Sequence, residues 1–280
     1  MAYDEASLSS RQRDMLEREE NILQAAQGIL LSEGFYDMSM ARVAEKSECP
    51  RGTIYRHFAS REDIVVALAC RAWTECLRML RRGAEYPGPS RARMAGAAEG
   101  FALFYRLYPD QFAMLDKANH TVREKASLHR IESLRHAEAA SADIVRSLLA
   151  DAVRAGELRT TEFDIEEVVF AISALATGGF GLHQSGFVGE AVVVGDVIEK
   201  TWWAFNMLAD AYGWRPLTHE RDWDEALSDV RRAVFPEESM RAYGEGAWYG
   251  TYNNAPPALR RHGIAAVLTR DDLPESSPTQ

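Results

Sequence analysis

A run of polar and basic residues between positions 51 and 57 has the chemistry needed to contact DNA. A guanidinium group binds O6 and N7 of guanine together, a threonine side chain touches a base or a thymine methyl, and basic or phenolic groups hold phosphates. Ile54 and Phe58, four residues apart, form the apolar face of a short helix. The other face leaves five groups for a partner outside the protein: Arg51, Thr53, Tyr55, Arg56 and His57.

The residues before this helix predict a second short helix and a tight turn. Ser39 is a good N-cap because its hydroxyl can accept a hydrogen bond from an amide of the first turn. Met40, Val43 and Ala44 then fall on one helical face. Pro50 disfavours helical geometry at the residue before it and suits the start of a new helix. Two short helices joined this way are typical of a helix-turn-helix, spanning about residues 39–58, whose second helix enters the DNA major groove.

Residues 18–79 resemble the DNA-binding domain of the tetracycline-repressor (TetR) family. The likeness rests on a first helix followed by Glu33-Gly34-Phe35, on the string Gly-Thr-Ile-Tyr-Arg-His-Phe at 52–58, and on Ser-Arg-Glu-Asp at 60–63 opening a fourth helix. The family usually has Gly at the position of Glu48 and Ser at that of Pro50. Glu48 must therefore adopt a turn conformation that glycine reaches more easily.

The predicted DNA contacts divide into base readout and phosphate binding. Arg51 is the candidate for direct readout, and Thr53 for a base or a thymine methyl. The resemblance implies phosphate contacts for Tyr55, His57, Ser39 and Arg61, and the helix N-termini at the last two also offer amides to an anion. Solvation remains open for Arg56, and half-buried packing for Tyr55. The full predicted set is Ser39, Arg42, Arg51, Thr53, Tyr55, Arg56, His57 and Arg61.

The charge distribution suits a site-specific DNA binder and excludes a protein that coats DNA. The 280-residue chain carries a net charge of −10, with 46% apolar and 26% charged residues. Residues 39–61 hold five basic against two acidic residues, a local charge of +3. Attraction to the DNA phosphates is needed only where the recognition helix enters the groove. The longest uncharged apolar stretch, 168–182, is shorter than the roughly 20 residues that span a bilayer. We expect a cytoplasmic protein with no membrane partner.

The sequence offers no catalytic or metal-binding constellation. It has no Gly-rich phosphate loop or nucleophile elbow, and Gly178–Gly181 lies in an apolar helix that follows no strand. The three cysteines are not spaced as metal ligands. A redox switch on DNA binding at Cys49, in the turn, stays an alternative. His129 and His136 share a helix face without a completing ligand. We expect no enzyme, no cofactor and no metal.

The hydrophobic pattern predicts an all-α protein. Helices are expected over 13–32, 60–82, 90–107, 120–155, 164–182 and 190–212 besides the two of the helix-turn-helix and a short one from Pro109. The predicted organisation is a TetR-type DNA-binding domain at 13–79, a helical regulatory and dimerisation domain at 80–214, and an atypical C-terminal extension of unknown role at 215–280. Its aromatic residues, including Trp223 and Trp248, predict that the extension packs on the body through about residue 265.

Two further partners are predicted by the resemblance together with the residue pattern. The small residues of helix 165–182 and the near-heptad spacing in 190–212 favour a homodimer over an ordinary core. The predicted dimer residues are Ala174, Gly178, Val194, Ile198 and Phe205. The region between the DNA-binding domain and the dimer helices holds many large apolar residues, and each one alone is best explained as core. Together they could line a pocket for a small apolar or aromatic ligand. The predicted ligand residues are Trp73, Phe101, Phe104, Tyr105, Phe112 and Met114. The predicted function is a homodimeric repressor released from double-stranded operator DNA by that ligand; the alternative is an architectural or ligand-independent DNA-binding protein.

Overall fold

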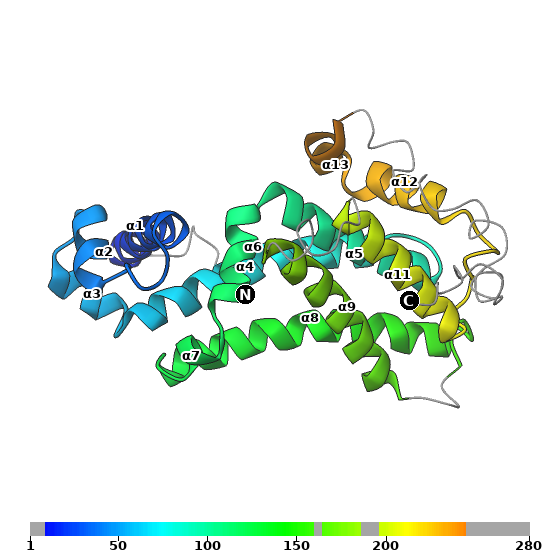
Figure 1. Ribbon diagram of the computed structural model, residues 1–280, viewed down its shortest axis with the longest axis horizontal. Coiled ribbons are helices and arrows are strands. Elements are labelled where there is room, and N and C mark those ends of the chain that lie inside the picture. Colours follow the sequence, from blue (N-terminus) through cyan, green and yellow to red (C-terminus); the bar gives the residue numbers. More distant parts are fainter. Residues whose placement is uncertain (1–8, 160–163, 186–195, 245–280) are drawn as a thin grey trace, which may run out of the picture. The chain divides into compact units, whose positions relative to one another are not determined.

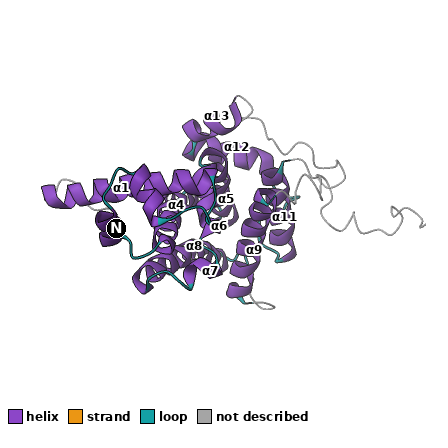
Figure 2. Cartoon of the chain, turned by 60° about the vertical axis from the view of Figure 1, so that its left-hand side comes forward, coloured by secondary structure: helices purple, strands orange, loops and turns teal. Residues whose placement is uncertain are grey.

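The computed structural model describes residues 9–159, 164–185 and 196–244 (Figure 1). All regular elements within these ranges are helices, as Figure 2 shows, so the predicted all-α class is confirmed. The chain forms two compact units. The first unit comprises residues 1–77 and 108–140, and the second comprises 78–107 and 141–280. Two helices, α4 and α8, contribute to both units. The domain boundaries expected from the sequence stay a prediction.

The first unit contains the helix-turn-helix and the helices that support it. Its centre is built from apolar side chains of the first four helices, among them Ile22, Ile29, Val43, Ile54, Phe58 and Ile64. Its helices are α1 (Ser10–Ser32), α2 (Met40–Lys46), α3 (Arg51–His57), most of α4 (Arg61–Ala84), α6 (Pro109–Lys117), α7 (His120–Arg123) and the beginning of α8 (Leu128–Arg154).

Helix α1 begins at Ser10, three residues before the predicted start at 13. Ser9 and Gln12 form a capping box, in which the backbone amide of Gln12 donates to the Ser9 hydroxyl at 3.3 Å and the Ser9 amide donates to Gln12 Oε1 at 3.0 Å. These bonds satisfy amides that would otherwise lack partners at the helix start. The earlier start was not predicted, because the segment is polar and its capping box has Gln12 where Glu is more familiar.

The single helix predicted over 120–155 is wrong, because the structure breaks it into α7 and α8. Asn119 caps the short α7, whose Val122 amide donates to Asn119 Oδ1 at 3.3 Å. The backbone amide of Ser127 then donates a hydrogen bond to Asp63 Oδ1 at 2.7 Å. An amide used in this tertiary contact is not available to a continuous helix. The break is therefore a consequence of packing against the start of α4.

The second unit is formed by the end of α4, α5 (Ser90–Leu107), the rest of α8, α9 (Ile165–Gln184), α11 (Val197–Ala211), α12 (Trp223–Val234) and α13 (Pro236–Tyr243). Helices α9 and α11 pair, and α12 and α13 pack on α5 (Figure 1). The helix predicted over 190–212 begins at Val197, capped by Asp196, and its predicted first residues lie outside the described ranges. A Cβ at Gly83 would lie 1.9 Å from the carbonyl oxygen of Gly96, so α4 and α5 cross backbone to backbone.

Helix α9 is unusually apolar for a helix that is largely exposed among the described residues. Its most apolar 18-residue window has a mean hydropathy of 1.5, and only 17% of that window is buried. By length and composition alone it could cross a membrane, but a single such helix is weak evidence for that. Phe170 is 74% exposed, and Leu182 is also exposed on this helix.

The part of the C-terminal extension that the structure describes packs on the second unit, as its aromatic content predicted. Trp223 and Phe235 are buried. Arg91 anchors the extension from α5, donating from Nη1 to Asp210 Oδ1 at 2.6 Å and to the carbonyl oxygens of Trp214 and Pro216, both at 2.8 Å. Burial lowers the pKa of Arg91, and the hydrogen bond to Asp210 acts in the opposite direction. Trp248 lies outside the described residues.

Candidate nucleic-acid interface and ligand pocket

The turn between α2 and α3 has the geometry that the sequence predicts. The amide of Arg42 donates to Ser39 Oγ at 3.3 Å, which confirms Ser39 as the N-cap of α2. Glu48 has a φ of +53°, in the left-handed region that favours glycine. The next amide, of Cys49, closes the turn by donating to the Ala44 carbonyl at 3.0 Å. Helix α3 follows, with the amide of Thr53 donating to the Pro50 carbonyl at 2.8 Å.

Helix α3 turns one face into the first unit and the other to solvent. Ile54 is fully buried, whereas Arg51 and Tyr55, one turn apart, are exposed. Half-buried packing therefore does not describe Tyr55. Arg56 is also exposed and its Nη2 donates to Thr53 Oγ1 at 3.4 Å, so this guanidinium lies along its own helix. The exposed face thus presents one guanidinium, Arg51, in the first turn and a phenol, Tyr55, one turn later.

The other predicted contact residues have partners within the first unit. Arg42 on α2 forms an ion pair with Glu33. Arg61 donates from Nη1 to the carbonyl oxygens of Met38 at 3.3 Å and Phe35 at 3.4 Å, and its guanidinium lies 4.4 Å from the Phe35 ring centre. Arg61 thereby holds the loop between α1 and α2. The phosphate contacts proposed for Arg42 and Arg61 stay predictions, and each would have to form beside these internal bonds.

His57 is placed differently from an open phosphate contact. Its side chain is 4% exposed, and its Nδ1 lies 3.7 Å from Glu19 Oε2 on α1. Arg130, at the start of α8, donates to the His57 carbonyl oxygen at 3.4 Å and to Glu19 Oε1 at 3.2 Å, and lies 4.9 Å from the Phe58 ring centre. The end of α3 is therefore clamped by α1 and α8. No local sequence signal indicates Arg130, because it lies 73 residues from His57.

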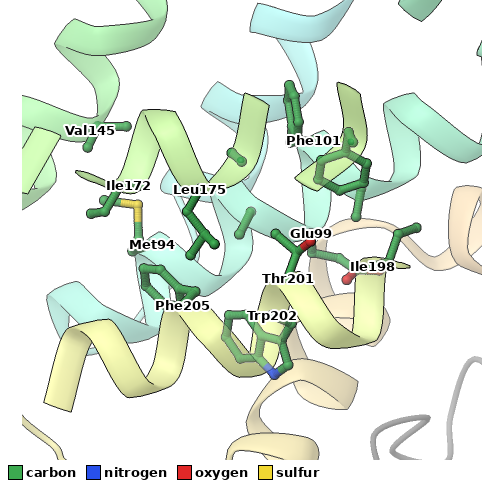
Figure 3. Close-up of a pocket in the computed structure, with 14 residues that line it drawn as sticks. Met94, Glu99, Phe101, Val145, Ile172, Leu175, Ile198, Thr201, Trp202 and Phe205 are labelled. Atoms are coloured by element: carbon green, nitrogen blue, oxygen red, sulfur yellow. The ribbon is translucent and has the colours of Figure 1, made fainter. Parts of the chain in front are cut away.

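The second unit contains an apolar cavity of about 100 Å³ (Figure 3). Apolar side chains reach it from α5, α8, α9 and α11; those labelled in Figure 3 include Met94, Val145, Ile172, Leu175 and Phe205. Two polar residues join them, Glu99 from α5 and Thr201 from α11. The chemistry of the cavity is that of small-molecule sites, which are mostly apolar with a few polar groups that fix orientation.

The predicted ligand residues are not brought together by the fold. Phe101 lines the cavity. Phe104 is buried on α5 but is not among the lining residues, and Tyr105 contacts Phe180 and His183. The other three belong to the first unit: Trp73, Phe112 and Met114. The six residues therefore divide between the two units, because helical spacing alone does not tell which unit a helix face serves, and their role in ligand binding stays a prediction.

The predicted dimer residues also divide. Ala174 and Gly178 are exposed on α9. Ile198 and Phe205 on α11 are buried and line the cavity. Val194 lies outside the described residues. A near-heptad pattern marks an apolar face, but it does not say whether the same chain or a second copy covers that face.

Glu99, the one charged side chain among the described residues that line the cavity, is paired from the C-terminal extension, a contact that sequence reasoning missed. Arg231 of α12 donates from Nε to Glu99 Oε1 at 2.8 Å and from Nη2 to Oε2 at 3.3 Å. Both side chains are 1% exposed. The Arg231 guanidinium lies 4.3 Å from the ring centre of Tyr243, and burial raises the pKa of this tyrosine.

Within the described ranges no group of His, Cys, Asp and Glu could hold a metal ion.

Comparison with known proteins identifies the helix-turn-helix. Residues 22–68 match the sequence model of the bacterial regulatory proteins of the tetR family. No curated protein sequence matches the chain. Solved structures with the same fold include the TetR-family transcriptional regulator PfmR of Thermus thermophilus, at 15% identity and a TM-score of 0.52, covering 67% of this chain and 96% of that one.

Two other structures of this fold have ligands or receptor functions in their descriptions. One is the transcriptional regulator FadR of Bacillus subtilis in complex with stearoyl-CoA, at 13% identity and a TM-score of 0.54, covering 68% of this chain and 96% of that one. The other is a γ-butyrolactone receptor described as ArpA-like, at 16% identity and a TM-score of 0.53, covering 78% of this chain and 98% of that one. Between about a fifth and a third of this chain has no counterpart in these three proteins.

Proposed function

We propose that this chain, which belongs to the tetR family of bacterial regulatory proteins, is a homodimeric, sequence-specific repressor released from its operator by a small apolar ligand. The family and the fold are those of transcriptional regulators. The proposal goes beyond the family and the fold in five respects: DNA recognition by particular residues, dimerisation, repression, ligand release and a cytoplasmic location.

The observation that carries the proposal is the exposed face of α3. Arg51 stands in the first turn of a helix whose opposite face is buried through Ile54, and Tyr55 follows one turn later. The N-terminal residues of a recognition helix are those that meet base edges in the major groove. The charge of +3 over residues 39–61 supplies phosphate attraction at this face, while the net charge of −10 disfavours coating of DNA elsewhere.

The uncovered face of α9 supports a homodimer. Phe170, Ala174 and Gly178 follow one another at four-residue spacing and are exposed, and Leu182 continues the row. A contiguous apolar row of this kind marks an interaction site in a soluble protein. A second copy of the same chain would cover it around a two-fold axis, because small residues let helices approach closely. Two copies would also supply the two recognition helices that a palindromic operator needs.

The cavity of the second unit supports a ligand. Its lining is apolar except for Glu99 and Thr201. An engineered apolar cavity of about 150 Å³ in another protein binds benzene, so a volume of about 100 Å³ suits a compact molecule of roughly one ring unless the site expands. A ligand releases DNA only through a difference in its affinity for the DNA-bound and DNA-free conformations.

Selection of DNA by the purified protein from a random duplex library tests DNA recognition and repression together. We expect one palindromic sequence with half-sites about 34–36 Å apart or a multiple of this distance, bound with a steep salt dependence. Transcription from a promoter carrying that sequence should fall when the protein is added. Equal binding to all duplexes would replace the proposal with an architectural role, and activation of the promoter would remove repression from it.

A compound screen tests release by a ligand. Small apolar compounds that raise the thermal unfolding temperature are added to the protein–operator complex. We expect at least one to lower operator affinity. If compounds bind in the cavity and operator affinity is unchanged for all of them, the protein is a DNA-binding regulator that these ligands do not release.

A further inference from the structure

The ion pair between Glu99 and Arg231 brings a charged group to the edge of an apolar cavity. Glu99 lines the cavity formed by α5, α8, α9 and α11 (Figure 3), and Arg231 of α12 donates a hydrogen bond to its carboxylate. From these contacts we infer that the cavity selects a neutral apolar molecule that carries one hydrogen-bond donor, such as a phenolic or alcoholic hydroxyl, and that α12 imposes this selection through Arg231. The inference rests on the proposed function, whose ligand site it specifies.

The first step concerns charge. Burying a lone carboxylate is costly, and Arg231 compensates the charge of Glu99 with two hydrogen bonds at 2.8 and 3.3 Å. The pair is neutral as a whole. A ligand with its own carboxylate or ammonium group would therefore add an uncompensated charge to an apolar cavity. This argues against both anionic and cationic ligands.

The second step concerns hydrogen bonding. An ionised carboxylate only accepts hydrogen bonds, and its two oxygens have about four acceptor sites, more than Arg231 and the neighbouring Tyr243 hydroxyl together fill. A ligand donor reaching Glu99 forms a charge-assisted bond in surroundings without bulk water. A ligand with only acceptor groups gains nothing there. Thr201, the other polar residue of the lining, both donates and accepts, so it does not discriminate.

The third step concerns Arg231, whose position is fixed by the extension. Its guanidinium lies 4.3 Å from the Tyr243 ring centre. The corner between α12 and α13 is held to the last turn of α4, because Arg82 Nη2 donates to the Val234 carbonyl at 2.7 Å. Phe235 at this corner is fully buried, with its Cζ 3.2 Å from where a Cβ of Gly100 would lie. Arg231 therefore acts as a positioning residue that orients Glu99 from outside the cavity.

The test compares ring compounds of matched size by calorimetry on the full chain: phenol, toluene, benzoate and benzylammonium. We expect phenol to bind at least about tenfold more tightly than toluene, since a hydrogen bond to a charged group is worth about that factor or more. Benzoate and benzylammonium should bind more weakly than toluene. A cavity-filling Ala176→Phe variant should lose phenol and toluene alike.

Variants separate the ion pair from the rest of the cavity. Glu99→Gln alone would leave Arg231 buried without its partner and threatens folding, so the pair is replaced together by Glu99→Leu and Arg231→Met, an exchange that proteins often tolerate. This double variant should bind toluene at least as tightly as phenol. Thr201→Val should keep the preference for phenol. Arg232→Met, at the exposed neighbouring position of α12, serves as the matched control and should change nothing.

The outcomes distinguish the inference from the proposed function. Equal binding of phenol and toluene, or tighter binding of either ion, overturns the selection inferred here and leaves the cavity as a ligand site. A preference for phenol that survives the double variant, or phenol binding that survives Ala176→Phe, also overturns it. If none of the four compounds binds, both the selection and the cavity's place in the proposed function fail.

Discussion

The carboxylate of Asp63, at the start of α4, accepts hydrogen bonds from both the backbone amide and the hydroxyl of Ser127, at 2.7 and 3.0 Å. It also accepts one from the amide of Ala59, at 3.2 Å, just after the recognition helix. Asp63 is almost fully buried. One side chain thus joins the end of the helix-turn-helix, the start of α4 and the turn before α8.

Replacing Asp63 with Asn should lower the free energy of unfolding by about 1–3 kcal/mol. The amide keeps one acceptor oxygen but turns a donor toward the backbone amide of either Ser127 or Ala59, leaving a buried polar group unsatisfied. Denaturant unfolding followed by circular dichroism measures the change. Asp116→Asn, at an exposed position of α6, is the control and should be neutral. An unchanged midpoint for the Asp63 variant would show that these bonds contribute nothing net.

Replacing Arg51 with Ala should cost about 1–3 kcal/mol in operator affinity and relax the preference at one base pair. The side chain is exposed and has no structural partner to lose within α3, so folding should be unaffected. Binding of the selected operator and of its single-base variants, measured by fluorescence anisotropy, gives both quantities. Arg56→Ala on the same helix is the comparison, because loss of a phosphate contact there would weaken all sequences about equally and leave the base preference unchanged. If the Arg51 variant keeps the affinity and specificity of the parent, base readout lies elsewhere.

A charged residue at Gly178 should convert the dimer to a monomer. A Cβ at this position meets nothing within 4 Å, so Gly178→Glu is compatible with the folded chain and disturbs only what covers α9. Light scattering at micromolar concentration should report the monomer mass, and operator affinity should fall. Ala139→Glu, at an exposed position of α8, controls for added charge. Phe205, also predicted for the interface, is unsuitable because a charge there would lie in the buried cavity wall.

Glu48→Gly should raise the free energy of unfolding by about 0.5–1 kcal/mol. A left-handed conformation costs an ordinary L-residue about 1–2 kcal/mol, and the greater freedom of glycine in the unfolded chain offsets about half of this gain. Thermal unfolding should show a higher midpoint. Glu45→Gly, in the preceding helix, should instead lower it. A lower midpoint for Glu48→Gly would mean that the glutamate side chain stabilises the turn by contacts of its own.

Thiol alkylation should be slow at Cys70. Burial raises the pKa of this thiol from 9.0 to about 11, so the reactive thiolate is scarce at pH 8 and remains the minor form at pH 10. The folded state binds the proton more tightly than the unfolded chain, so this contribution to stability is complete below pH 9 and is lost as the pH approaches 11. Mass spectrometry after iodoacetamide treatment at pH 8 and pH 10 follows the reaction. Rapid modification of Cys70 at pH 8 would contradict the raised pKa. The buried Cys76 provides the internal comparison.

Local signals predicted the helix-turn-helix well because its determinants lie within a few residues of one another. The Ser39 cap, the left-handed Glu48 and the buried Ile54 all follow from short-range geometry. The break before α8 depends on Asp63, 64 residues away, and the cavity's ion pair joins residues 132 positions apart. Neither pairing leaves a local trace in the sequence. The predicted ligand residues divide between the two units for the same reason, since periodicity identifies an apolar face without naming its neighbour.

The anchoring of the extension by Arg91 and Arg231 limits how this chain can be shortened. Cutting it at Tyr212, near the length of its structural relatives, would leave Glu99 without its counter-ion and take from Arg91 the carbonyl oxygens of Trp214 and Pro216. It would also empty the space that Phe235 fills beside Gly100. The second unit and the extension are therefore mutually dependent parts of one fold. We therefore expect truncation at Tyr212 to destabilise the second unit, and the extension to need its partners on α5 in order to fold.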